Sequence, residues 1–181
     1  RWISELDDVV EQVSTLAGRT LVQYTPFAGD YSIQNLTRDF VLTRLSPSPS
    51  LELRFTERML TRFNEVIAAS AISPLDIQRS RILKIIFELR SSVRRLEKLG
   101  NTASFELIVR ASEAIRDYLH FELQDWTSIV YFEQAARSAC EALGDSVRLG
   151  QVLTSLAAAV VKLDGKHEDP IDLCKQGIAL L

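Results

Sequence analysis

The stretch QDWTSI (residues 124–129) opens one predicted apolar helix, and the stretch DGKHEDPI (residues 164–171) opens another. They contain Trp126 and His167, which lie about 41 residues apart. Between them, the stretch EALGD (141–145) has the glycine and the acidic residue typical of one helix ending and the next beginning. A helix-turn-helix unit that recurs at about 40 residues predicts a helical repeat array, in which each unit buries its apolar face against its neighbours.

The composition is that of an ordinary folded domain with much helix. Hydrophobic residues make up 46% of the 181 residues and charged residues 25%, while seven Gly and five Pro leave few turn formers. The formal net charge of −3 gives no general attraction to nucleic acid or to an anionic membrane. Since no apolar run approaches the roughly 18 residues that span a bilayer, we expect no membrane insertion.

Two cysteines, Cys140 and Cys174, lie in apolar helical stretches without a CxxC partner or a nearby histidine. Such residues are typically buried free thiols, which fit a reducing compartment. We therefore expect an intracellular, cytoplasmic protein. Arg1 begins the chain without a signal pattern and Leu181 ends it inside an apolar pattern, so we also expect a fragment of a longer protein.

Apolar residues at spacings of three and four predict about eight helices. The clearest runs from about 74 to 99, ends at Gly100, and is followed by Thr102 as a candidate cap of the next helix. Short turns between long amphipathic helices predict antiparallel neighbours. The predicted fold is therefore all-α, with antiparallel helical hairpins stacked as an α-solenoid. The other helices are predicted at about residues 2–18, 32–45, 55–67, 102–123, 126–143, 146–163 and 169–181.

The segment at residues 19–31 has a less regular pattern. It contains TLVQY, which suits a short strand, but Pro26, Gly29 and the lack of a partner strand favour a loop. Asp30 or Ser32 is then a candidate cap for the helix that follows. We predict a loop here, leading into a helix.

The stretch SPSPS (46–50) cannot continue a helix, because each proline lacks an amide donor and restrains the residue before it. It is the strongest candidate for a domain boundary. We predict that residues 1–50 form an N-terminal helical segment or cap, with this stretch as its linker. Residues 51–181 are then the helical repeat domain.

Small residues mark the last predicted hairpin. Ala157 and Ala158 precede the turn at Gly165, and Gly177 lies on the following helix, where a small side chain lets paired helices approach closely. At these positions the sequence resembles a tetratricopeptide repeat, with Gly165 as the turn glycine and His167 in the aromatic place.

The stretch DWTSIVYFEQAA (125–136) is similar to the second helix of the same repeat, with Trp126 in the aromatic place. The resemblance covers about residues 103–181, and a generic array of helical hairpins is the alternative. Pro170 departs from the alanine that the family prefers at its position.

The resemblance implies a protein-interaction module, a scaffold or sensor arm, in which the first helices of the pairs line a groove for a partner's peptide or helix. Ser155, Ala159 and Lys162 are implied to face this groove from the last unit. Less direct candidate contacts are Tyr118 and the basic row Arg90, Arg94 and Lys98.

Positive charge is concentrated in the middle of the chain. Residues 38–98 contain twelve Lys and Arg against seven Asp and Glu, which leaves nine against seventeen elsewhere. Arginine binds carboxylate and phosphate through two-point contacts, so these basic side chains can hold an acidic peptide, a phosphorylated segment or nucleic acid. A solvated polar face without a ligand is the favoured interpretation. Nucleic acid is disfavoured because no aromatic residues alternate with the Lys and Arg side chains. A second group of basic residues, Arg54, Arg58 and Arg62, lies at i, i+4 and i+8. We call it the alternative basic face, because it could bind an anionic ligand in place of the basic row at residues 90–98.

The sequence contains no evident catalytic or metal-binding constellation. His120 and His167 have no acidic neighbours at a recurring metal-ligand spacing, and the common phosphate-loop, dinucleotide, zinc-protease and hydrolase motifs do not occur. We predict no enzyme, no cofactor and no metal. A further hypothesis is a structural or regulatory domain that packs on other domains of its parent protein, motivated by the apolar residues Ile178, Leu180 and Leu181.

Overall fold

The computed structural model describes residues 22–25, 30–33, 49–69, 75–163 and 169–181. The chain divides into two units, residues 1–48 and 49–181, and each unit is described by itself. The predictions for the helix at 2–18, for most of the helix at 32–45, and for Gly165 and His167 lie outside the described residues.

The first unit contains a two-stranded antiparallel sheet where a loop was predicted. Strand β1 spans Val22–Thr25 and strand β2 spans Asp30–Ile33, and the strands pair along all four residues of each. Val, Tyr, Thr and Ile are residue types that favour strands. The expected helix cap at Asp30 or Ser32 is therefore wrong, because pairing with β1 holds this segment extended.

The second unit is helical, which confirms the all-α prediction for its described residues. A π-helical segment, η2 (Tyr118–Leu123), continues α5. Helix α3 begins at Pro49, inside the stretch predicted as a linker, because the fixed φ of proline suits the first helical position. Against about eight predicted helices, the described residues form six α-helices, namely α3 (Pro49–Ala68), α4 (Leu75–Leu99), α5 (Thr102–Asp117), α6 (Trp126–Leu143), α7 (Ser146–Val160) and α8 (Pro170–Leu180).

Side-chain caps keep the connections between these helices short. Asp125 and Asp145 cap α6 and α7, because each carboxylate accepts a backbone N–H of the first turn. Asn101, rather than Thr102, caps α5: its side chain accepts the backbone N–H of Ser104, and the Ser104 hydroxyl accepts the N–H of Asn101. The direct turns make successive helices antiparallel neighbours.

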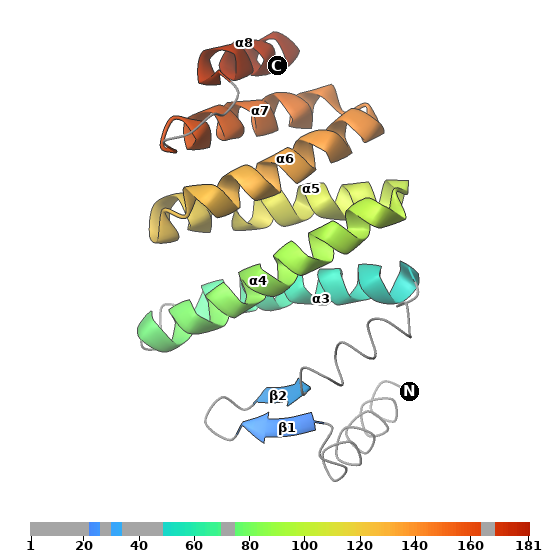
Figure 1. Cartoon of the computed structure of the whole chain (residues 1–181), viewed down its shortest axis with the longest axis vertical. Coiled ribbons are helices and arrows are strands. Elements are labelled where there is room, and N and C mark those ends of the chain that lie inside the picture. Colours follow the sequence, from blue (N-terminus) through green and yellow to red (C-terminus); the bar gives the residue numbers. More distant parts are fainter. Residues whose placement is uncertain (1–21, 26–29, 34–48, 70–74, 164–168) are drawn as a thin grey trace. The chain divides into compact units, whose positions relative to one another are not determined.

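Each helix packs against the next along the chain, from α3 to α8 (Figure 1). In addition, α3 contacts α5, and α4 contacts α6. Helices α4 and α6 thus form one layer and α3 and α5 a second layer, with α4 and α6 in front in Figure 1. This order brings residues about 40 positions apart in sequence onto neighbouring helices of one layer.

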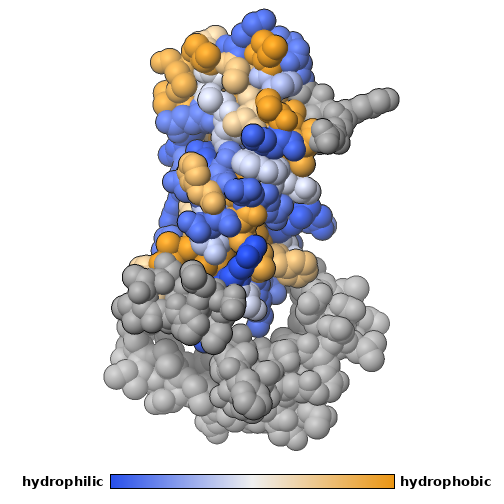
Figure 2. All heavy atoms as spheres, turned by 90° about the vertical axis from the view of Figure 1, so that its left-hand side faces the viewer, coloured by the Kyte–Doolittle hydropathy of each residue, from blue (hydrophilic) through white to orange (hydrophobic). Residues whose placement is uncertain are grey.

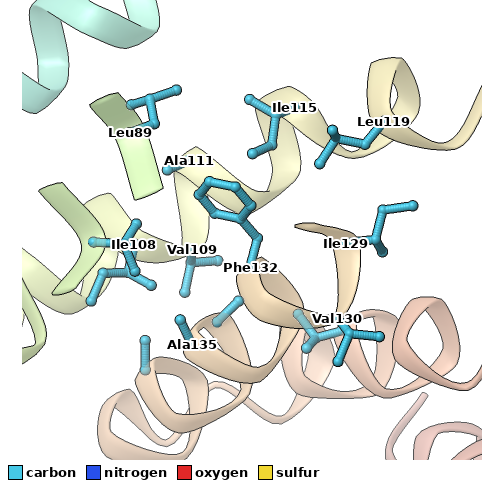
Figure 3. Packing of buried hydrophobic residues seen from close by; sticks show 14 of the residues in the cluster. Leu89, Ile108, Val109, Ala111, Ile115, Leu119, Ile129, Val130, Phe132 and Ala135 are labelled. Carbon is cyan, nitrogen blue, oxygen red and sulfur yellow. The ribbon is translucent and has the colours of Figure 1, made fainter. Parts of the chain in front are cut away.

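Phe132 of α6 lies at the centre of the shared core. Its side chain is 1% exposed, and in Figure 3 its ring lies next to Ala111 and Ile115 of α5, with Leu89 of α4 nearby. Complete burial of such a side chain contributes about 1.5–3 kcal/mol. One continuous core therefore joins α4, α5 and α6.

Helices α7 and α8 cross at two glycines. A Cβ atom added to Gly177 would lie 2.9 Å from the carbonyl oxygen of Gly150, and one added to Gly150 would lie 2.9 Å from that of Gly177. The predicted role of Gly177 as a small residue between paired helices is confirmed by this approach. Its partner, Gly150, was not predicted.

Candidate partner-binding surface

One side of α4 combines exposed apolar and basic side chains. Leu83 and Phe87 lie one turn apart and are 45% and 62% exposed. Because a helix repeats every 3.6 residues, side chains at spacings of three and four share one stripe. We call this stripe, together with Tyr131 of α6, the α4 face. Its basic members are Arg79, Arg90, Arg94 and Lys98.

Tyr131 is joined to α4 through two arginines. Its hydroxyl donates a hydrogen bond of 3.0 Å to the backbone carbonyl oxygen of Arg90. The guanidinium carbon of Arg90 lies 4.4 Å from the centre of the Tyr131 ring, and that of Arg94 lies 5.7 Å from it. Separations within about 6 Å are typical of cation–π contacts. The Tyr131 ring thus holds the positive charges of Arg90 and Arg94 close together.

The electrostatics around Tyr131 keep its hydroxyl protonated. Burial raises the pKa of this hydroxyl above its ordinary value and the charge of Glu97 adds to the effect, whereas Arg94 and Arg90 lower it. The net shift is upward, so the hydroxyl remains a hydrogen-bond donor at neutral pH. This donor fixes the ring beneath Arg90.

The α4 face keeps its positive charge in the folded unit. Helix α4 has seven basic and three acidic residues. Arg95 pairs with the buried carboxylate of Glu52 on α3, at 2.8 Å. Within the described ranges, by contrast, Arg94 and Lys98 have no acidic side chain at ion-pair distance. These two charges are therefore accessible to a ligand.

The groove residues predicted on α7 have three different environments. Ala159 is 0% exposed, so the prediction that it faces a partner is wrong; its small side chain instead lets α7 pack closely in the core. Ser155 is half-buried and donates a hydrogen bond of 2.9 Å to Glu133. Lys162 is exposed, as a contact residue requires.

Glu133 is the centre of a buried polar cluster between α5, α6 and α7. Its side chain is 1% exposed, and Arg116 donates to its two carboxylate oxygens at 2.6 and 3.2 Å. Burial lowers the pKa of Arg116, but the hydrogen bond and charge of Glu133 outweigh it and raise the pKa overall. We call Glu133, Arg116, Ser155 and His120 the Glu133 cluster.

The Glu133 cluster has the chemistry of a structural tie. His120 Nε2 lies 3.5 Å from the Ser155 hydroxyl oxygen, which already donates to Glu133. Because Arg116 neutralises the carboxylate, Glu133 is held as a paired ion rather than as a free base. A nucleophilic serine needs a base positioned to accept its proton and a third group to orient that base. Here the Ser155 hydroxyl donates instead to Glu133, a carboxylate that is already paired with Arg116.

The remaining predicted contacts lie on other surfaces. Tyr118 is half-buried in η2, and its ring packs edge-to-face on Phe63 of α3, with 6.0 Å between ring centres. Burial raises the pKa of its hydroxyl. Tyr118 thus packs η2 against α3. The alternative basic face is exposed on α3 and consists of Arg54, Arg58 and Arg62.

No metal-binding arrangement occurs among the described residues, where no group of three His, Cys, Asp or Glu side chains converges. In the same part of the chain, no helix combines the length and the apolar character needed to cross a bilayer. Cys140 is a buried free thiol, as predicted, and burial raises its pKa to about 11. Cys174 is also free and is half-buried.

Sequence patterns did not select Leu83, Phe87 or Tyr131 as contact residues. The first two lie outside the apolar stripe that contains Ile82 and Ile86, and this offset was a usable signal. No comparable signal marked Tyr131, because its place beside Arg90 depends on the packing of α6 against α4.

Comparison of the chain with protein-family models, with curated proteins and with solved structures finds no match in any of the three. The α4 face and the Glu133 cluster are therefore interpreted from their own geometry.

Proposed function

We propose that this chain is a protein-recognition module without catalytic activity, built as a tetratricopeptide-like α-solenoid that binds a peptide or helix of a partner protein. The hairpins α3–α4, α5–α6 and α7–α8 follow one another in chain order, and each contacts the next. Such nearest-neighbour packing is what a repeat array requires. The close crossing of α7 and α8 at Gly150 and Gly177 supports the same architecture.

The observation that carries the proposed function is the α4 face. Leu83 and Phe87 expose apolar surface beside accessible positive charges, whereas most large apolar residues of the unit are in its core. Aromatic and arginine side chains dominate the binding energy of many protein interfaces. We propose that the partner of this scaffold or sensor arm binds to the α4 face rather than to the groove predicted along the first helices of the hairpins. Lys162 is then a separate contact residue outside the α4 face.

The proposed surface is tested by an affinity pull-down with two matched variants. Phe87→Glu places a carboxylate in the α4 face, and Phe121→Glu makes the same change on η2, where Phe121 is 77% exposed. We expect Phe87→Glu to lose partners that the unmodified chain and Phe121→Glu retain. Equal capture by all three proteins would contradict the α4 face as the binding surface, and thermal melts would show that both variants fold.

The exposed side of α8 supports a second candidate function, a structural domain that packs on other parts of its parent protein. Ile171, Ile178 and Leu181 are 62%, 69% and 68% exposed. Figure 2 shows apolar groups among hydrophilic ones at the top of the unit, where α8 lies. A chain extended beyond Leu181 should then melt at a higher temperature. An unchanged melting temperature would count against this candidate.

A further inference from the structure

Resting on the proposed recognition function, we infer that the partner presents an acidic amphipathic helix to the α4 face. Apolar side chains of this helix cover Leu83 and Phe87. Its carboxylates bind the basic end of the face, which consists of Arg90, Arg94 and Lys98.

The spacing of the α4 face matches a helix. From Leu83 to Lys98 the face extends over about 23 Å, at a rise of about 1.5 Å per residue. Its side chains recur once per turn, about every 5.4 Å, and a partner helix presents its own side chains at the same interval. An extended peptide places same-side residues about 6.6 Å apart and loses register within a few contacts. Partner helices in apolar grooves use the same i, i+3 and i+4 anchors.

The charges of the α4 face point to carboxylates. Arg90 and Arg94 lie over one Tyr131 ring, so their positive charges repel each other. The Nε–H of Arg90 is buried and has no hydrogen-bond acceptor in the described part of the chain. The charge of Glu97 raises the pKa of the Tyr131 hydroxyl, so this acid lies near the basic end of the face. It is one negative charge beside the three positive charges of Arg90, Arg94 and Lys98. A carboxylate that bridges the outer N–H groups of both arginines removes the repulsion through charge-assisted hydrogen bonds.

The aromatic residues of this face favour a protein over a nucleic acid. Proteins that bind a single strand stack successive bases on several aromatic rings. Of the two rings of the α4 face, Phe87 and Tyr131, Phe87 is the exposed one. The Tyr131 ring is occupied by Arg90, and its hydroxyl is bonded to the Arg90 carbonyl oxygen. Leu83 lies next to Phe87 and offers an aliphatic surface that suits apolar side chains of a helix.

Selection of displayed random peptides, about four helical turns long, against the whole chain tests the inference. We expect enriched peptides to carry Asp or Glu together with apolar residues at spacings of three and four. The tightest peptide should gain helical circular dichroism on binding. Its affinity should fall on the order of tenfold with Arg94→Gln, the loss expected for one charge-assisted hydrogen bond. Arg110→Gln, which removes an exposed arginine of α5 outside the α4 face, should leave the affinity unchanged.

The outcomes separate this inference from the proposed function. The inference of an acidic helix is overturned if the enriched peptides lack Asp and Glu or bind in an extended form. It is also overturned if they bind Arg94→Gln as tightly as the unmodified chain. Each of these results still leaves the proposed recognition module in place. Failure to enrich any peptide overturns both. Tighter binding of a labelled single-stranded oligonucleotide, lost with Arg94→Gln, overturns the inference in favour of nucleic acid. Phe87→Gln is the second variant, and it should weaken the peptide without affecting the melt.

Discussion

The Glu133 cluster and the α4 face use arginine in opposite ways. In the cluster, Arg116 is bound through two hydrogen bonds to a carboxylate that is almost completely buried. On the α4 face, Arg94 is exposed and lies over the Tyr131 ring without an acidic partner among the described residues. The neighbouring helix therefore decides whether an arginine stabilises the fold or remains accessible for binding.

Removal of Arg116 should have the largest effect on stability. Arg116→Ala leaves the Glu133 carboxylate buried without its counter-charge, so we expect the free energy of unfolding to fall by about 3 kcal/mol. Arg94→Ala, the matched control on the α4 face, should change it by less than about 0.5 kcal/mol. Urea denaturation measures both values. Equal losses in the two variants would remove the contrast between the regions.

Gly177→Ala tests whether tight packing continues to the C-terminal hairpin. In a helix with space available, alanine in place of glycine stabilises by up to about 1 kcal/mol. Here the new Cβ would lie 2.9 Å from a backbone oxygen, so we expect a net loss of about 2 kcal/mol from overpacking. Ala179→Ser, at an exposed position of α8, is the control. A higher midpoint of urea unfolding for Gly177→Ala would show that α7 and α8 are further apart than described.

Of the three substitutions expected to destabilise the fold, Tyr131→Phe should have the smallest effect, a loss of about 1 kcal/mol for the hydrogen bond to Arg90. Burial raises the pKa of this hydroxyl in the folded chain above its unfolded value of about 10. The resulting stabilisation is complete below the unfolded pKa and is lost as the pH rises through the folded pKa. The stability of the unmodified chain should therefore fall more steeply than that of Tyr131→Phe as the pH rises above about 10. Parallel pH profiles from urea denaturation would show that the hydroxyl is not buried.

Much of the helical fold was predictable, because periodicity and caps are local. Apolar spacing located α3 to α8, and the short turns predicted their antiparallel order. The hairpin of β1 and β2 was missed, because residues 22–25 and 30–33 form strands only by pairing with each other. Ala159 was assigned to a groove by the tetratricopeptide resemblance, which does not show which side of α7 its neighbours cover, and the residue is buried.

The sequence by itself determined the helices, their turns and the burial of Cys140, since propensity, capping and apolar periodicity act within a few turns of the chain. Only the tertiary structure decided which arginines are structural. The carboxylate that binds Arg116 lies 17 residues away on the next helix, and the Tyr131 hydroxyl reaches a carbonyl 41 residues back in the sequence. Pairing over such separations depends on helix stacking, which no local pattern encodes. The α4 face is therefore a product of packing, although every residue in it belongs to an ordinary helical pattern.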